Sequence, residues 1–234
     1  MITVYTVAYN EEMFIQFMID HYRERFPGCK IVCYDNMSTD RTVEILKANN
    51  CEVISYDTNN QIDDNRYLQI KNNCWKTATT DWVLVCDVDE LLDIDEKTLK
   101  EEDLKGITII RSEAYNMVNM EDNFDLINIK YGARCSPYDK YYLFKKSELT
   151  EISYTHGCHG ASPKGRALYS DKCYLLYHYK CVHPDYMVER YKLFHSRLSE
   201  ANKRYKWGNH YSSPSEEVRE SFILARTYVT KIKD

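Results

Sequence analysis

The chain has 234 residues, of which 44% are hydrophobic and 29% are charged. This length and balance are typical of one compact domain and exclude intrinsic disorder and fibrous repeats. The formal net charge of −5 gives no general attraction to nucleic acid or to an anionic membrane surface, so we expect neither as a partner.

The lack of a recognisable targeting signal and the pattern of cysteines favour a cytoplasmic protein. The longest strongly apolar run, Trp82–Cys86, is far shorter than the ~20 residues that span a bilayer, so no transmembrane segment is expected. Residues 1–10 lack the positive region of a signal peptide and are typical of a core strand. The nine cysteines are scattered without a CxxC pair, which favours reduced thiols over disulfides or a zinc ribbon.

In the first hundred residues, strand patterns alternate with helix patterns. Ile2–Ala8 predicts a strand, and Asn10 is a suitable cap for the helix that follows. Trp82–Cys86 is apolar on both faces, so its strand should be central. This alternation predicts a parallel sheet covered by helices. Further strands are expected at Lys30–Tyr34 and Glu52–Tyr56, and further helices after Ser38–Asp40 and over Asp64–Thr77.

Beyond the first hundred residues the pattern loosens. A helix near Glu96–Leu104 and a strand at Ile107–Arg111 precede a polar stretch, 112–139, that we expect to be an insertion lining a site. Strands are expected again at Tyr141–Lys145 and around the apolar run Tyr174–Leu176, and helices after Pro184 and after Ser213. We therefore expect a single domain in three parts, residues 1–111, 112–183 and 184–234.

Acidic and polar residues follow the predicted strands. In an open parallel sheet, ligands bind outside the carboxyl ends of the strands. The three carboxylates of Asp87, Asp89 and Glu90 repel one another unless a cation compensates, and hard oxygen ligands suit Mg²⁺ or Mn²⁺. An acidic helix N-terminus is the alternative interpretation. The other residues at these strand ends are Tyr9, Asn10, Glu11, Asp35, Asn36 and Asp57.

Four segments resemble, in this order, those of a known enzyme family. Thr6–Glu12 is similar to a first nucleotide loop, Asp35–Asp40 to a uracil-side loop, Asn65–Tyr67 to a helix start that places an arginine near the nucleotide, and Trp82–Glu90 to a strand leading into a DxD motif. The family is that of the glycosyltransferase family 2-like enzymes of GT-A fold. Within it, the chain resembles a small group whose metal motif reads Asp-Val-Asp-Glu. The resemblance covers about residues 1–95.

The resemblance implies a fold, an activity and a set of ligands. The fold is α/β, with a mostly parallel, Rossmann-like central sheet, helices on both faces and a helical C-terminus. The activity is transfer of a sugar from a nucleotide-diphosphate sugar, uridine-linked, to a hydroxyl of a glycan or other acceptor, with Mn²⁺ or Mg²⁺ as cofactor. The implied metal ligands are Asp87, Asp89 and His178, and the implied nucleotide contacts are Thr6, Tyr9, Asn10, Asp35, Arg66 and Asp87.

Several of these residues have a simpler interpretation. Tyr9 could serve packing, Asp35 could be a turn residue, and Arg66 could be a solvated helix charge. Asp87 would meet the ribose or a metal-bound water, whereas Asp89 would bind the metal directly. His178, late in the domain, could equally be satisfied by ordinary hydrogen bonds.

The catalytic base is the least defined part of the prediction. Thr155–Gly160 contains two histidines and a cysteine but lacks a second ligand pair for zinc. By chain order it lies where inverting relatives supply an acidic base, and the Glu-Asp pair expected there is missing. The base candidates are His156, His159, Asp139 and Glu113.

Two other functions compete with the transferase. One is a nucleotide-sugar or glycan binding protein of the same fold that has lost turnover. The other is a nucleotidyltransferase, which also uses paired acids and Mg²⁺ but should carry a glycine-rich phosphate loop that the chain lacks after its first strand. The sequence leaves open the donor sugar, the acceptor, the stereochemical outcome and the oligomeric state.

Overall fold

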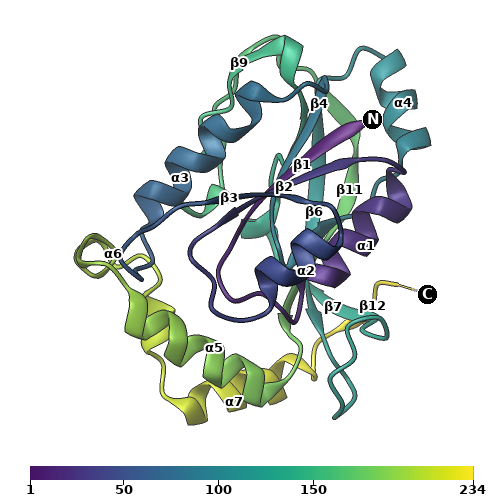
Figure 1. Ribbon diagram of the computed structural model, residues 1–234. Coiled ribbons are helices and arrows are strands. Elements are labelled where there is room, and N and C mark those ends of the chain that lie inside the picture. Colours follow the sequence, from purple (N-terminus) through teal and green to yellow (C-terminus); the bar gives the residue numbers. More distant parts are fainter. Residues whose placement is uncertain (234) are drawn as a thin grey trace.

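The computed structural model describes residues 1–233 and has a central sheet flanked by helices (Figure 1). The first four strands pair in parallel in the order β3-β2-β1-β4. Both β1 and β4 are buried along almost their whole length, because their side chains are apolar on both faces. The prediction of a central strand at Trp82–Cys86 is therefore confirmed. The four strands are β1 (Ile2–Ala8), β2 (Lys30–Asp35), β3 (Glu52–Ser55) and β4 (Trp82–Asp87).

Helices connect these parallel strands. They are α1 (Ile15–Arg25), α2 (Thr42–Ala48) and α3 (Asp64–Asn73), the last starting at Asp63, whose carboxylate accepts the backbone N–H groups of Asn65 and Arg66. The prediction that Asn10 caps the first helix is wrong. Asn10 has φ of 52°, and its side-chain oxygen Oδ1 accepts from the backbone N–H of Thr39 at 2.8 Å. Asn10 therefore connects two loops, and α1 begins only at Ile15.

The rest of the sheet is mixed. β6 and β11 pair in parallel, and the other pairings of this half are antiparallel. The prediction of a loose insertion over 112–139 is partly wrong, because β6 runs on through this stretch to Val118. The strands are β5 (Glu90–Leu92), β6 (Ile109–Val118), β7 (Tyr131–Arg134), β8 (Leu143–Lys145), β11 (Tyr169–Cys181) and β12 (Thr230–Lys231), with β9 (Leu149–Glu151) and β10 (Lys164–Gly165) in a separate small sheet.

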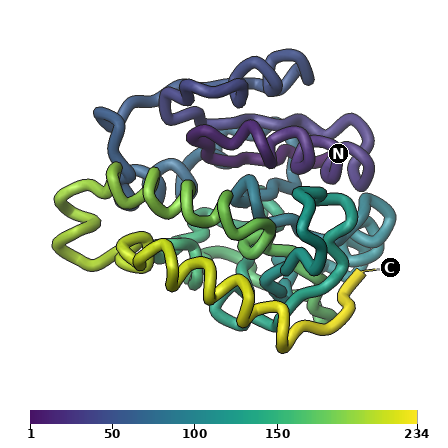
Figure 2. Tube along the Cα trace, turned by 90° about the horizontal axis from the view of Figure 1, so that it is seen from below, coloured from purple at the N-terminus to yellow at the C-terminus, as the bar shows by residue number. Residues whose placement is uncertain are grey.

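The C-terminal helices predicted after Pro184 and Ser213 are confirmed. They are α5 (Pro184–Arg197), α6 (Glu200–Tyr205) and α7 (Ser215–Ala225), and Figure 2 shows α5 and α7 side by side. The turn after α5 is tied to the N-terminal half, because the N–H of Ile62 donates to the Arg197 carbonyl at 2.6 Å and the N–H of Ser199 donates back to Ile62 at 3.1 Å. The remaining helix, α4 (Glu96–Leu104), lies where it was predicted.

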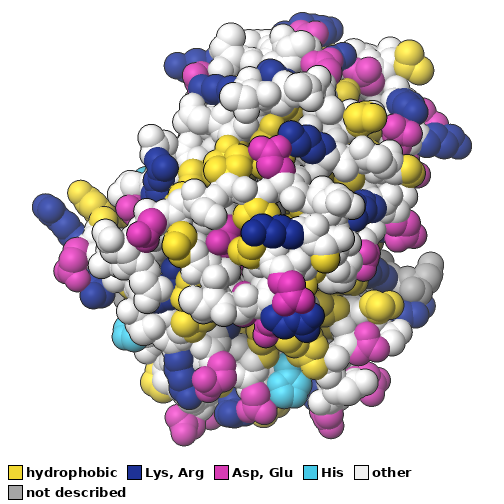
Figure 3. Space-filling view, viewed as in Figure 1, with side chains coloured by type: hydrophobic (Ala, Val, Ile, Leu, Met, Phe, Trp, Pro, Cys, Tyr) yellow, Lys and Arg dark blue, Asp and Glu magenta, His cyan; other side chains and the backbone are white. Residues whose placement is uncertain are grey.

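The distribution of surface charge and the state of the cysteines match the expectations from the composition. Basic and acidic side chains are mixed over the face shown in Figure 3. All nine cysteines carry free thiols. None of the helices within residues 1–233 has the length and hydropathy needed to cross a membrane.

Candidate active site

A pocket of about 290 Å³ opens at the carboxyl ends of β1 and β4. One side of it is the acidic turn, which we define as Asp87–Glu90 between β4 and β5. The opposite side comes from residues 190–211, which we call the C-terminal wall; from it Arg190, Phe194, Asn202, Gly208, His210 and Tyr211 line the pocket. The pocket therefore lies where an α/β sheet binds its ligands.

Asp87 is neutralised by lysines. The Lys71 ammonium donates to one carboxylate oxygen, and the Lys140 ammonium lies 3.5 Å from the other. Burial by itself would raise the pKa of Asp87, but the two ammonium groups outweigh it and hold that pKa well below its usual range. Asp87 is therefore a fixed anion whose charge is already balanced.

Glu90 is balanced in the same way. Its side chain is almost fully buried, Lys140 donates to it at 2.8 Å, and the Tyr142 hydroxyl donates to its other oxygen. Burial would lower the pKa of Lys140, yet the carboxylates of Glu90 and Asp87 raise that pKa, so Lys140 stays charged. Two carboxylates and two ammonium groups thus form a buried neutral cluster beneath the pocket.

Asp89 has no such partner. The nearest cationic nitrogen, Nη2 of Arg190, lies 3.7 Å away. The Arg190 guanidinium is committed to Glu11, with hydrogen bonds of 2.9 and 2.8 Å to its two oxygens. Asp89 is therefore the carboxylate of the acidic turn whose charge is least compensated.

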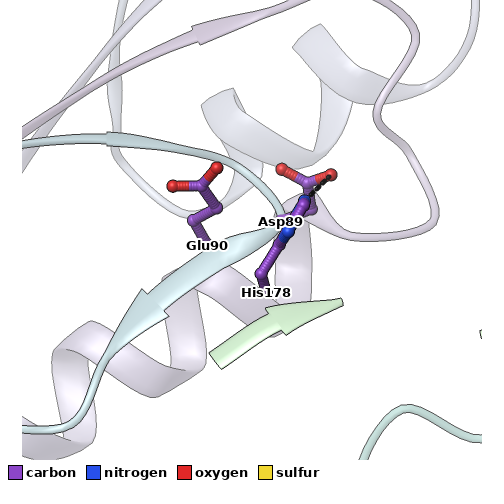
Figure 4. Close-up of side chains that lie close together, drawn as sticks. All are labelled: Asp89, Glu90 and His178. Carbon is purple, nitrogen blue, oxygen red and sulfur yellow. Dashed lines mark ion pairs between the residues drawn. The ribbon is translucent and has the colours of Figure 1, made fainter. Parts of the chain in front are cut away.

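His178 faces Asp89 from β11. Its Nδ1 lies 2.8 Å from the Asn116 side-chain carbonyl, which can only accept, so Nδ1 carries the proton. Its Nε2 consequently presents a lone pair toward Asp89, 3.9 Å away. Burial lowers the pKa of His178, which keeps the ring neutral, and Tyr138 stacks on it at 4.3 Å. Figure 4 shows the imidazole pointing from its strand to the Asp89 carboxylate.

These side chains fit a divalent cation. Ligand atoms of Asp89, Glu90 and His178 all lie within 4.8 Å of one another. Two carboxylates and a neutral imidazole held by a second hydrogen bond are suitable ligands for Mn²⁺. Asp87, which the resemblance implied as a ligand, is not brought into this group and is bound by Lys71 instead.

Only some of the residues predicted to contact the nucleotide line the pocket. Tyr9 and Asp87 line the pocket, whereas Thr6, Asn10, Asp35 and Arg66 do not. Asp35 is buried and accepts from the backbone of its own loop at Ser38, so with Asn10 it shapes the loops behind the pocket. Arg66 is exposed and donates to Gln69.

Arg197, rather than Arg66, packs on the pocket residue Tyr9. Its guanidinium covers the Tyr9 ring at 3.1 Å, and its Nε donates to Asn60. The side chain is only 3% exposed, yet Nη1 and Nη2 have no hydrogen-bond partner. Burial lowers the pKa of this guanidinium, because no carboxylate compensates it.

Of the predicted bases, His159 alone lines the pocket. Its Nδ1 donates to the Pro137 carbonyl at 2.8 Å, which leaves Nε2 with a free lone pair. Gly157, with φ of 70°, permits this arrangement, since a Cβ there would lie 2.6 Å from the His159 ring. His156 stacks on Trp207 instead, and Glu113 and Asp139 both pair with Arg134 away from the pocket.

The sequence matches the profile of glycosyl transferase family 2 over residues 3–149. The match spans more than half of the chain, so the chain belongs to glycosyltransferase family 2 and is a glycosyltransferase domain. The resemblance found in its motifs is thereby confirmed. Among curated proteins, none matches the sequence.

Solved structures with a similar fold are glycosyltransferases. TarS of S. aureus has a TM-score of 0.50 and 18% identity, over 96% of this chain and 43% of TarS. The structure of TarS 1–349 in complex with UDP has a TM-score of 0.49 and 17% identity, over 95% of this chain and 70% of that one.

A third structure is more distant. Glucosyl-3-phosphoglycerate synthase from Mycobacterium tuberculosis, in complex with Mn²⁺, UDP and glucosyl-3-phosphoglycerate, has a TM-score of 0.36 and 21% identity, over 48% of this chain and 43% of that one. At such identities the likeness concerns the fold, and the match to TarS confirms the GT-A fold predicted from the motifs. The chain spans less than half of the length of TarS.

Proposed function

We propose that the chain transfers a sugar from a nucleoside diphosphate donor to a hydroxyl of a glycan or other acceptor, with Mn²⁺ or Mg²⁺ at Asp89, Glu90 and His178. The observation that carries the proposal is the unbalanced charge of Asp89 beside the free lone pair of His178, in the pocket of a family 2 glycosyltransferase domain. Lys71 and Lys140 already balance Asp87 and Glu90, so the charge that a cation would compensate is chiefly that of Asp89.

The donor nucleotide is assigned to the Tyr9 side of the pocket. Tyr9 lines the pocket, and the two unpartnered nitrogens of Arg197 lie against its ring. A nucleotide that reached them after a small side-chain rotation would satisfy a buried guanidinium. The similarity of Thr6–Glu12 and Asp35–Asp40 to nucleotide loops supports uridine as the base.

The diphosphate is assigned to the space above the acidic turn. A divalent cation held by Asp89, Glu90 and His178 would supply Lewis-acid stabilisation of the departing nucleoside diphosphate. Arg190 adds a second positive charge beside Asp89. The residues of the turn are held by the buried lysine pairs, so the site is preorganised before the donor binds.

The acceptor hydroxyl is assigned to the His159 side. Nε2 of His159 would take the hydroxyl proton, and the bond from Nδ1–H to the Pro137 carbonyl would stabilise the resulting imidazolium. No carboxylate is needed for this step, which agrees with the missing Glu-Asp pair.

The proposal is tested by thermal shift of the chain with UDP, GDP, CDP and their sugar conjugates, with Mn²⁺, Mg²⁺ or chelator. We expect uridine compounds to raise Tm only with the metal present, because a ligand of the native state stabilises it. Release of free sugar from the stabilising donor, followed by chromatography, then separates an active enzyme from a binding protein. If no nucleotide raises Tm under any condition, the proposal is wrong.

A further inference from the structure

Three aromatic rings form a stack that the donor and the cation do not use. Trp207 lies on His156 with ring centroids 3.8 Å apart and an interplanar angle of 23°. Tyr205 lies on Trp207 at 4.9 Å and 25°. The rings come from two segments that are far apart in the sequence, the turn at 156–158 and the end of α6.

The stacked rings do not line the pocket themselves, but their sequence neighbours do. The residues that follow His156, namely Gly157, Cys158 and His159, line the pocket. Gly208, His210 and Tyr211, which follow Trp207, line it from the C-terminal wall. The stack therefore joins the base side of the pocket to the wall, beside His159.

The outer ring of the stack is both exposed and fixed. Tyr205 is 57% exposed, although it is one of the largest side chains of the segment. Lys206 adopts a left-handed conformation with φ of 61°, and the N–H of Trp207 donates to the Asn202 carbonyl at 2.9 Å. His156 contacts Asn65 at 3.2 Å from the other end. A flat ring is thus held in one orientation at the surface.

Two basic residues without an ion pair to a described carboxylate, Arg204 and Lys206, flank Tyr205 in the sequence. The Arg204 guanidinium lies 5.7 Å from the centre of the Tyr205 ring. Lys203 pairs with Glu200 at 2.9 Å, but Arg204 and Lys206 form no ion pair with a described carboxylate. Figure 3 shows basic, acidic and hydrophobic side chains projecting together at the edge of the molecule where α6 lies in Figure 1.

We propose that this stack is an acceptor subsite for an acidic sugar. The apolar face of a pyranose ring would lie on Tyr205, and Arg204 and Lys206 would receive its carboxylate, phosphate or sulfate group. The assignment rests on the proposed function, since the subsite places the acceptor beside His159. A purely structural role explains the contact between His156 and Trp207, but it does not explain an exposed Tyr205 held parallel to them.

The test is binding of the full chain to an array of neutral and acidic oligosaccharides, including maltooligosaccharides, oligogalacturonides and sulfated or phosphorylated glycans. We expect acidic members to bind and Tyr205→Ala to weaken them at least fivefold. Tyr228→Ala is the matched control, because Tyr228 is 58% exposed and lies beyond α7. Binding should also change Trp207 fluorescence, since Trp75 and Trp82 are buried.

Three results would overturn the proposal. They are an array on which no glycan binds, equal binding by the wild type and Tyr205→Ala, and a preference for single-stranded oligonucleotides, whose bases also stack on aromatic rings. The Arg204→Gln/Lys206→Gln double variant should lose acidic glycans more than neutral ones, and equal loss of both contradicts the charge assignment. Nucleotide thermal shifts should be unchanged in Tyr205→Ala, so failure of donor binding is recognised separately.

Discussion

The acidic turn and the C-terminal wall face each other across one pocket but are built differently. The turn follows a buried central strand, and two of its three carboxylates, those of Asp87 and Glu90, are held by lysines that are themselves almost fully buried. The wall is joined to the sheet by a few contacts, chiefly the pairing of Ile62 with 197–199 and the ion pair of Glu11 with Arg190. From this difference we expect the metal to be held by the densely packed turn and the substrates to be selected by the more loosely attached wall.

The largest effect is expected on the turn. Asp89→Asn removes the carboxylate of the acidic turn that has no lysine partner and lies 3.7 Å from Arg190. Metal-dependent nucleotide binding and donor turnover should therefore fall at least about 1,000-fold, or about 4 kcal/mol. Titration calorimetry with UDP and Mn²⁺ checks this. Asp171→Asn, an exposed residue on β11, is the control. Unchanged Mn²⁺ dependence would remove Asp89 from the metal site.

The junction between turn and wall should dominate stability. Arg190→Met leaves Glu11 buried without its partner, and loss of one member of a buried pair destabilises a protein by about 3–5 kcal/mol. Urea unfolding measures the change. The double variant Glu11→Gln/Arg190→Met should lose less than the single one. Lys192→Met, from an exposed pair on the same helix, should change the unfolding free energy by less than about 1 kcal/mol.

Low pH should reduce the stability of the fold through protonation of His21. This residue belongs to α1; its ring packs on Tyr22, contacts the Leu92 carbonyl at 2.9 Å and faces Arg25, Asp93 and Lys233. Burial is the main cause that lowers its pKa to about 4. Between pH 6.5 and 4 the unfolded chain binds the extra proton, so stability should fall by about 3 kcal/mol as the pH falls through this range.

Unfolding curves of His21→Gln test this expectation. The variant should lose less stability than the wild type between pH 6.5 and 4, because Gln does not titrate. His195→Gln, an exposed histidine of α5, should follow the wild type. Parallel pH curves for the wild type and His21→Gln would show that acid acts elsewhere.

The smallest expected effect is a difference in nucleotide affinity between variants of two arginines, Arg197 and Arg66. Arg197→Ala should weaken nucleotide binding about tenfold, or about 1.4 kcal/mol, because it removes the guanidinium beside Tyr9. Arg66→Ala should stay within about twofold, since Arg66 is exposed and donates to Gln69, whereas Arg197 packs on Tyr9. Equal losses in both variants would mean that the wall does not take part in nucleotide binding.

The parallel half of the fold could be predicted because its signals are local. Alternating apolar runs and helix patterns are read from neighbouring residues, and the carboxyl ends of parallel strands necessarily meet at one edge. Asp89 and Tyr9 were selected in this way, whereas His178 was implied by the family resemblance and His159 by its position in the chain. The family resemblance was equally local, since its motifs lie within the first 95 residues.

The tertiary structure decided how these residues act. Whether a carboxylate is balanced depends on which cation packs against it, and Lys71, Lys140 and Arg190 have no sequence signal that pairs them with Asp87, Glu90 and Glu11. For the same reason Arg197 rather than Arg66 lies on Tyr9. The sequence by itself determined the class of sheet and the chemistry at its edge, whereas long-range packing determined which acid is free and what closes the pocket.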